Sequence, residues 1–137
     1  MKKVIVVILL ALLLFGGVLN AQVSNTDGAM KIAVPATGSE KNSLISKETG
    51  RAPFFLFFDE NGNFIEAMKN PAKDQHGGIS RTVVSLLSDN NVTMIIAESI
   101  GEKMKQSLTA NHINFVNNTG TADDAVRAIT QKTIKKK

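Results

Sequence analysis

VTMIIAESIGEKMKQSLTANHINFVNNTGTADDAV, residues 92–126, alternates segments typical of strands with segments typical of helices. Val92 to Ala97 is a short run of mainly apolar residues, as expected for a buried strand. The polar segment that follows carries Met104 and Leu108 at helical spacing, and Ile113 to Val116 is a second apolar run. A strand, a helix and another strand in this order predict parallel strands joined by a right-handed crossover.

Both helices of this stretch begin with a capping pattern. Ser99-Ile100-Gly101-Glu102 has the form of a capping box, in which Ser99 accepts a bond from a backbone N–H and Glu102 reaches back. Thr121-Ala122-Asp123-Asp124 opens the last helix in the same way, with two acids at its positive end. The inward face of that helix is predicted to carry Ala122, Ala125, Val126 and Ile129.

Two apolar segments upstream flank a turn. Phe54 to Phe58 is continuously apolar, and Phe64 to Met68 resumes after Asp59-Glu60-Asn61-Gly62-Asn63. Because Asn61-Gly62 can supply the positive φ angles of a tight turn, the two segments predict a β-hairpin. The first arm suits a strand that is buried on both faces, whereas the more mixed second arm suits a position near the sheet edge.

Two further elements complete the predicted domain. Lys31 to Pro35 is a short β-rich run that stops in a loop containing Thr37-Gly38. After His76-Gly77-Gly78, apolar residues at helical spacing run from Ile79 to Leu87. The order β, β-hairpin, α, β, α, β, α predicts an α/β fold with a mixed five-stranded sheet flanked by helices.

The N-terminus has the three-part pattern of a secretory signal. Lys2 and Lys3 precede an apolar run from Val4 to Phe15, and Ala21 is the expected cleavage residue. The apolar run is shorter than the roughly 20 residues of an ordinary transmembrane helix, although an uncleaved segment extended to Leu19 would anchor the chain to a membrane. We therefore expect a signal peptide at 1–21, a linker at 22–29, one domain at 30–131 and a Lys-rich tail at 132–137. The mature protein would be periplasmic or secreted.

Charge and cysteine content exclude several classes of site. The chain has a formal net charge of +4 and no cysteine, so it forms no disulfide and offers no thiolate to a metal. Six lysines lie in the predicted signal and tail, and without them the net charge of the remaining body is −2. Because Trp and Tyr are absent as well, we expect no nucleic-acid-binding surface.

Several loops that contain glycine follow the predicted strands, where open α/β sheets bind their ligands. Glycine lets a backbone approach a ligand closely, and a helix N-terminus offers N–H donors with a partial positive charge. We therefore expect an anion-binding rim that includes Thr37, Gly38, His76, Gly77, Gly78, Ser99, Gly101, Thr119 and Gly120. The alternative is that each glycine only permits a tight turn and each Ser or Thr only caps a helix.

Two side chains add chemistry to this rim. Arg51, just before the aromatic strand, offers fixed donors to an anion, or else forms a surface salt bridge. His76 can ligate a metal as a neutral imidazole or pair with an anion as a cation, or else remain solvated. The sequence has no Gly-x-Ser-x-Gly, HExxH or phosphate-loop motif, so we expect a binding protein rather than an enzyme.

Taken in order, these segments resemble the dinitrogenase iron-molybdenum cofactor biosynthesis family. The resemblance covers residues 30 to about 129 and rests on Met30-Lys31-Ile32-Ala33-Val34-Pro35, Gly50-Arg51-Ala52-Pro53-Phe54-Phe55, Asn70-Pro71-Ala72, Gly77-Gly78, Ile95-Ile96-Ala97 before Gly101, and Gly120-Thr121. It implies a ribonuclease-H-like α/β fold without nuclease activity. It also implies a small anionic metal cofactor as ligand: an iron-molybdenum, molybdenum-sulfur or iron-sulfur cluster.

The sequence departs from the family pattern in two respects. Many members carry His-Phe directly before the Gly-Arg pair, whereas Glu48-Thr49 precedes Gly50-Arg51 here. The resemblance therefore implies that a cluster-contacting histidine is replaced by an acid, and that His76 in the neighbouring loop is the candidate to compensate. The export signal is the second departure, because nitrogenase cofactor assembly takes place in the cytoplasm.

Three functions are open at this point. The leading hypothesis is a non-enzymatic carrier of an anionic metal cofactor that acts outside the cytoplasm, for which the sequence names no partner protein. The second is an exported protein-interaction module that keeps the fold without a ligand. The third is an enzyme whose substrate no motif identifies.

Overall fold

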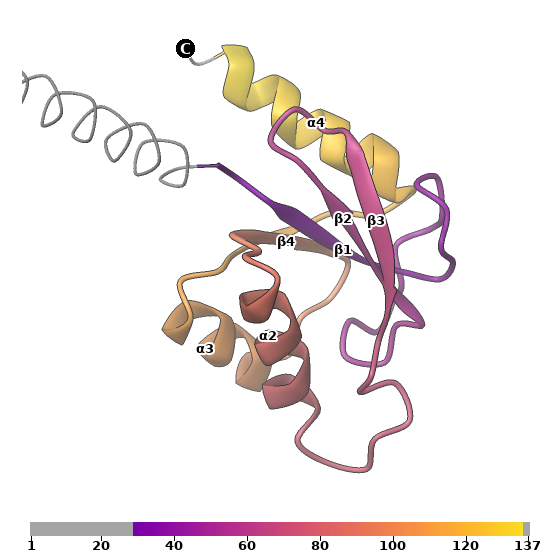
Figure 1. The fold of residues 1–137 in the computed structure, drawn as a ribbon, viewed down its shortest axis with the longest axis vertical. Helices are drawn as coiled ribbons and strands as arrows, with labels where there is room; N and C mark the ends of the chain where they lie inside the picture. The colour runs from indigo at the N-terminus through magenta and orange to yellow at the C-terminus, as the bar shows by residue number, and fades with distance from the viewer. Residues whose placement is uncertain (1–28, 136–137) are drawn as a thin grey trace, which may run out of the picture.

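The sheet forms the middle layer of the domain, and helices cover both of its faces. The structure is a computed structural model that describes residues 29–135. Its elements are β1 (Ile32–Ala36), β2 (Phe54–Phe58), β3 (Phe64–Lys69), α2 (Ile79–Asp89), β4 (Met94–Ala97), α3 (Glu102–Ala110), β5 (Asn114–Asn117) and α4 (Ala122–Lys135). Figure 1 shows α4 on one side of the sheet and α2 with α3 on the other. The predicted signal peptide, the linker except Ala29 and the last two residues of the tail lie outside the described range.

The five strands run in the order β3-β2-β1-β4-β5. β1 pairs in parallel with β4, and β4 pairs in parallel with β5. β2 is antiparallel to both β1 and β3, with Ala36 opposite Phe54 and Phe54 opposite Lys69. The predicted mixed five-stranded sheet is therefore confirmed, and so is the position of the second hairpin arm at an edge.

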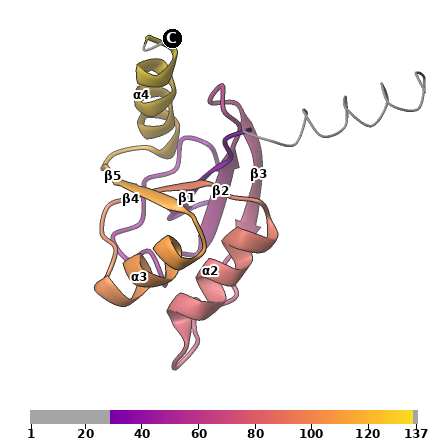
Figure 2. The same cartoon turned by 90° about the vertical axis from the view of Figure 1, so that its left-hand side faces the viewer.

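Each face of the sheet has its own hydrophobic core. Phe55 and Phe57 of β2 point into the core under α2 and α3, while Leu56 and Phe58 point into the core under α4. All four side chains are fully buried, as predicted for the first hairpin arm. Figure 2 shows the two helical layers on either side of the sheet. Within residues 29–135, no helix combines the length and apolar character needed to cross a bilayer.

The turn of the hairpin differs from the prediction. Gly62 has a positive φ of 84°, but Asn61 does not, so the turn does not need positive φ angles at both residues. The Asp59 carboxylate explains this difference, because its Oδ1 accepts hydrogen bonds from the backbone N–H groups of Asn61 and Asn63, each at 2.9 Å. The loop is therefore held by a side chain as well as by its glycine.

The predicted capping box at the start of α3 is wrong. The helix begins at Glu102, with Gly101 as its N-cap and no side-chain capping bond. Glu102 is thus the first helical residue, where it forms an ion pair with Lys105 at 3.5 Å instead of reaching back. The predicted cap of α4 is confirmed, since Thr121 Oγ1 accepts a bond from the Asp124 N–H at 3.3 Å.

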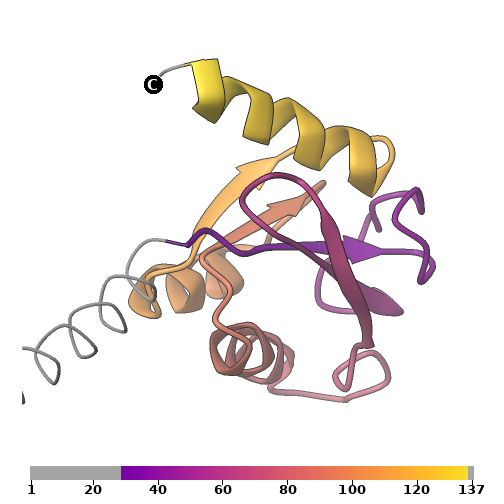
Figure 3. The ribbon, with the colours of Figure 1, turned by 45° about the horizontal axis from the view of Figure 1, so that its top comes forward.

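Sheet topology brings all the predicted site loops to the same end of the sheet, where β1, β4 and β5 terminate. β1, β4 and β5 are parallel, so their carboxyl ends lie at the same edge. The antiparallel hairpin adds the start of β2 and the end of β3 to that edge, because Ala36, Phe54 and Lys69 are neighbours in register. In Figure 3 the indigo and purple segment after β1 and the pink segment after β3 both extend from this side of the sheet.

Candidate anion-binding rim

Thr49 and Gly50 lie between the starts of α2 and α3. Thr49 Oγ1 donates a hydrogen bond to the Ser99 carbonyl at 2.6 Å, in the loop that leads into α3. A Cβ atom on Gly50 would lie 2.7 Å from Ile79 Cγ2, at the first residue of α2, and 3.6 Å from Met104 Cε in α3. Glycine at this position therefore allows the loop to pack directly against both helices.

Asn70 fixes the same loop from the opposite side. Its Nδ2 donates to the carbonyls of Gly50 and Ala52, each at 2.9 Å, and its Oδ1 accepts from the Ala72 N–H at 2.9 Å. The side chain is almost fully buried. Asn70 is a residue whose role the sequence did not reveal, and the signal available was its position in Asn70-Pro71-Ala72 directly after an edge strand.

Arg51 extends from this loop toward the loop that precedes α2. Its Nη1 donates to the carbonyls of Lys73 at 3.1 Å and Gln75 at 3.2 Å. Among the described residues, its guanidinium pairs with no carboxylate, so the structure does not contain the surface salt bridge considered as an alternative. Because the side chain is exposed and a guanidinium carries five donors, it retains N–H groups for an anion.

The three helix N-termini at this edge are not equivalent. In the described part of the chain, α2 and α3 each follow a glycine N-cap and neither has a side-chain capping bond. In α4, by contrast, the first N–H groups are occupied: Ala122 donates to the Ser43 carbonyl and Asp123 donates to the Lys41 carbonyl, each at 2.9 Å. Only α2 and α3 therefore present uncapped N–H donors at this edge.

The segment from Lys41 to Ser46 also occupies the other backbone groups near α4. The Gly120 carbonyl accepts from the Ile45 N–H at 2.9 Å, and the Thr37 N–H donates to the Leu44 carbonyl at 2.9 Å. The rim is thus divided into two groups of predicted residues. We call Arg51, His76, Gly77, Gly78, Ser99 and Gly101 the open half, and Thr37, Gly38, Thr119 and Gly120 the closed half.

Charge further distinguishes the helix starts. The first turn of α2 has no acidic residue, that of α3 has Glu102, and that of α4 has Asp123 and Asp124. Carboxylates at a helix N-terminus favour the helix but repel a second anion. The start of α2, where Gly77 is exposed and Gly78 has a φ of 67°, is the position best suited to an anion.

His76, the predicted metal ligand, is exposed in the loop just before α2. Within residues 29–135, no group of three or more His, Asp or Glu side chains is arranged to hold a metal ion. A role for His76 in metal binding therefore remains a prediction. Glu48, the acid that precedes Thr49-Gly50-Arg51, is exposed as well.

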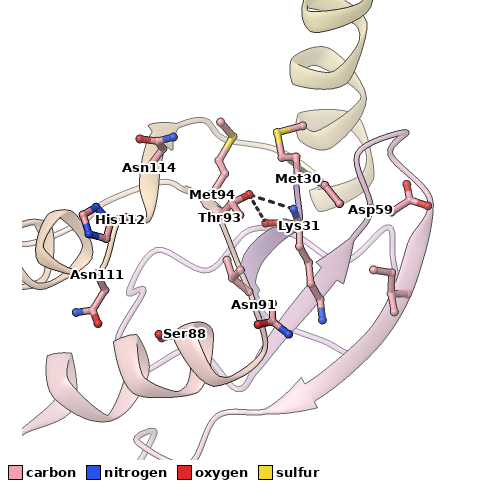
Figure 4. A pocket seen from close by; sticks show the side chains of 13 residues that line it. Met30, Lys31, Asp59, Ser88, Asn91, Thr93, Met94, Asn111, His112 and Asn114 are labelled. Carbon is pink, nitrogen blue, oxygen red and sulfur yellow. Dashed lines mark hydrogen bonds between the residues drawn. The ribbon is translucent and has the colours of Figure 1, made fainter. Parts of the chain in front are cut away.

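Two cavities bear on the choice of site. A cavity of about 350 Å³ adjoins the open half and is lined in part by Pro53, Lys69, Lys73 and Asp74. A larger one, of about 920 Å³, lies at the opposite edge of the sheet, near the start of β1 and the ends of α2 and α3. Figure 4 shows this larger cavity, where the Thr93 hydroxyl is bonded to the backbone of Lys31.

The larger cavity is poorly suited to an anion despite its size. Asn91 and His112, which follow α2 and α3 with φ angles of 62° and 59°, both line it. The C-terminal ends of helices carry partial negative charge, so these two helices direct their unfavourable ends toward it. We therefore assign the candidate anion site to the open half rather than to the larger of the two cavities.

Comparisons with known proteins support the fold and identify a family. A family described as dinitrogenase iron-molybdenum cofactor matches residues 30–132. Among curated proteins, no sequence matches significantly. The apo form of the orange protein from Desulfovibrio gigas is similar in structure, with a TM-score of 0.70 and 24% identity over 75% of this chain and 88% of that one. A Thermotoga structure described under the name NifB has a TM-score of 0.64 and 25% identity over 74% of this chain and 88% of that one.

Proposed function

The chain belongs to the dinitrogenase iron-molybdenum cofactor family, and on that premise we propose that it binds and carries an anionic metal-sulfur cluster without catalysing a reaction. The fold that it shares with the orange protein and with the Thermotoga structure supports this proposal. The ligand class is a small cluster of iron-molybdenum, molybdenum-sulfur or iron-sulfur type.

The observation that carries the proposal is the geometry of the open half. Gly50 directly precedes Arg51, and a Cβ on it would contact both Ile79 of α2 and Met104 of α3, so the segment that carries the guanidinium adjoins two helices whose starts are uncapped. Hydrogen bonds to a charged group contribute about 1.5–3 kcal/mol each. Two such bonds contribute about 3–6 kcal/mol to the binding free energy. Because about 1.4 kcal/mol corresponds to a tenfold change in Kd, they raise the affinity roughly a hundredfold to ten-thousandfold.

Hydrogen bonding would be the main mode of binding. The chain has no cysteine, and its described residues hold no group of three or more His and carboxylate side chains placed to bind a metal ion. A cluster that keeps its own sulfide ligands can accept hydrogen bonds from Arg51 and from the backbones of Gly77, Gly78 and Gly101. His76, in the loop before α2, would be a candidate side-chain ligand.

Loading of the purified protein tests this function. Molybdate, tetrathiomolybdate and reconstituted iron-sulfur clusters would be supplied under reducing conditions, followed by desalting, metal analysis and a visible spectrum. We expect retained metal and an absorption band with at least one probe, and a loss of about tenfold or more in affinity for Arg51→Ala. Arg127→Ala is the matched control, because Arg127 is an exposed arginine that pairs with Asp123 on α4. Retention of neither metal nor colour would refute the carrier function.

We propose that this function is exercised outside the cytoplasm. The support is the signal pattern at residues 1–21, which lies outside the described residues. Cell fractionation and N-terminal sequencing of the mature protein test it. We expect an N-terminus at Gln22 in the periplasmic or secreted fraction, whereas a cytoplasmic chain that retains residues 1–21 would contradict the proposal.

Exposed apolar side chains on β3 favour the protein-interaction module as a second candidate. Phe64 is 38% exposed and Ile65 is 49% exposed at the edge of the sheet. If this candidate is correct, Arg51→Ala and His76→Ala leave activity in the cell unchanged, while replacing Phe64 and Ile65 by serine abolishes it. The carrier function predicts the opposite pattern.

A further inference from the structure

Four polar side chains are buried within the described residues, and they differ in what they connect. Ser46 is bonded to Glu48 within its own loop, and Thr130 donates to the Val126 carbonyl within α4. Thr49 and Asn70 instead bond to segments that are distant in sequence. Both act on the same short segment, residues 49–53, which has Arg51 at its centre.

Both polar atoms of the Asn70 side chain form hydrogen bonds with the backbone around Arg51 or next to Asn70 itself. Its two Nδ2 bonds reach the carbonyls of Gly50 and Ala52, which flank Arg51, and its backbone N–H donates to the Pro53 carbonyl at 3.1 Å. A side chain that holds the carbonyls on both sides of a residue fixes the orientation of the backbone there. Asn70 therefore sets the direction in which the Arg51 side chain leaves the loop.

Thr49 fixes the position of residues 49–53 relative to the starts of α2 and α3. Thr49 is 97% buried, and its hydroxyl donates to the Ser99 carbonyl at 2.6 Å, which ties the loop to the start of α3. On the other side, a Cβ on Gly50 would lie only 2.7 Å from Ile79 Cγ2, so the loop passes close to the start of α2. The spacing between Arg51 and the two helix starts therefore depends on the Thr49 bond.

We propose that Thr49 and Asn70 are positioning residues of the open half, which hold Arg51 and the two helix N-termini in the geometry that binds the anion. This inference rests on the proposed carrier function for its ligand. Neither side chain contacts the ligand, because the polar atoms of both are already engaged with protein backbone. Thr49 thus contributes to affinity through Arg51.

A set of threonine variants tests this role with tetrathiomolybdate as the probe. Thr49→Val removes the hydroxyl at nearly constant shape, and we expect it to weaken binding by about tenfold, a coupling within the range found between neighbouring residues. Thr49→Ser restores the hydroxyl and should restore binding. Thr130→Val is the matched control, because Thr130 is as deeply buried as Thr49. It lies beside Gly62 in the turn between β2 and β3, at the end of the sheet away from the open half. The variant should lose stability but not affinity.

A double-mutant cycle separates positioning from general destabilisation. If Thr49 acts through Arg51, then Thr49→Val weakens binding in the wild type but has little further effect in an Arg51→Ala background. Equal losses in both backgrounds, or wild-type binding by Thr49→Val, would overturn the proposal.

A measurement without ligand distinguishes failure of this inference from failure of the carrier function. NMR relaxation of the Arg51 Nε–Hε group should show greater mobility in Thr49→Val and in Asn70→Ala than in the wild type or Thr130→Val. If the wild type binds no tetrathiomolybdate, the result for Arg51 mobility still decides the positioning role. Unchanged Arg51 mobility in both variants would refute it.

Discussion

Gly50→Ala should disrupt the contact on which the open half depends. The added Cβ would lie 2.7 Å from Ile79 Cγ2, closer than real Cβ contacts, whereas Met104 Cε at 3.6 Å is at ordinary contact distance. The clash is therefore with the first residue of α2 alone. Because Gly50 does not have a positive φ, the substitution adds crowding and no backbone strain.

The size of the effect follows from overpacking. An extra methyl group in a packed interior costs about 1–3 kcal/mol. For a domain of this size, each kcal/mol lowers Tm by about 4–8 °C, so Gly50→Ala should melt about 4–24 °C below the wild type. Gly77→Ala is the control, because a Cβ there would have no neighbour within 4 Å, and its stability should change by less than about 0.5 kcal/mol.

Thermal unfolding followed by circular dichroism measures this effect, and a second substitution identifies its cause. Ile79→Ala removes the atom that clashes, so Gly50→Ala should cost less in that background, with a coupling energy of at least about 0.5 kcal/mol. If Gly50→Ala melts like Gly77→Ala, or if the two changes are simply additive, the packing of the loop against α2 is not as described.

Three other outcomes are expected. Gly78→Ala should lower the free energy of unfolding by about 1–2 kcal/mol, because Gly78 has a φ of 67° in the left-handed region. Gly78→Asn should lower it by less, because Asn tolerates this region better than Ala. Burial raises the pKa of Asp59, but hydrogen bonds from Asn63, Asn61 and Gly62 outweigh it and keep this pKa below its ordinary value. Asp59 thus stabilises the fold at pH values above its unfolded pKa of about 4, and this contribution is lost as the pH falls through the folded pKa. In Asp59→Asn, Tm should therefore fall less steeply with decreasing pH in the acidic range than in the wild type. Binding of tetrathiomolybdate should weaken as NaCl rises, and salt-independent binding would argue against an electrostatic site.

Hydrophobic periodicity was enough to predict the architecture. The fully apolar arm from Phe54 to Phe58 indicated a strand between two cores, and both cores are present. The spacing of Met104 and Leu108 placed them inward on a helix, where both are buried. Such predictions succeed because burial depends on side-chain type and spacing, which the sequence states directly.

The division of the rim could not be predicted in this way. Residues 39–49 are polar and irregular in sequence, yet the backbone carbonyls of Lys41 and Ser43 occupy the first N–H groups of α4. Backbone groups are the same in every residue, so such bonds leave no pattern to detect. The false capping box at Ser99 has a related cause, since Gly101 ends the loop two residues later than the pattern suggested.

The most direct test of a ligand site in the open half is an NMR titration of the amide-labelled protein with tetrathiomolybdate. We predict that the largest shift changes occur at Arg51, at Gly77 to Arg81 and at Glu102 to Met104, while the amides of Gly120 to Asp124 hardly move. Shift changes confined to Asn91, His112 and their neighbours around the larger cavity, or no changes at all, would contradict the account.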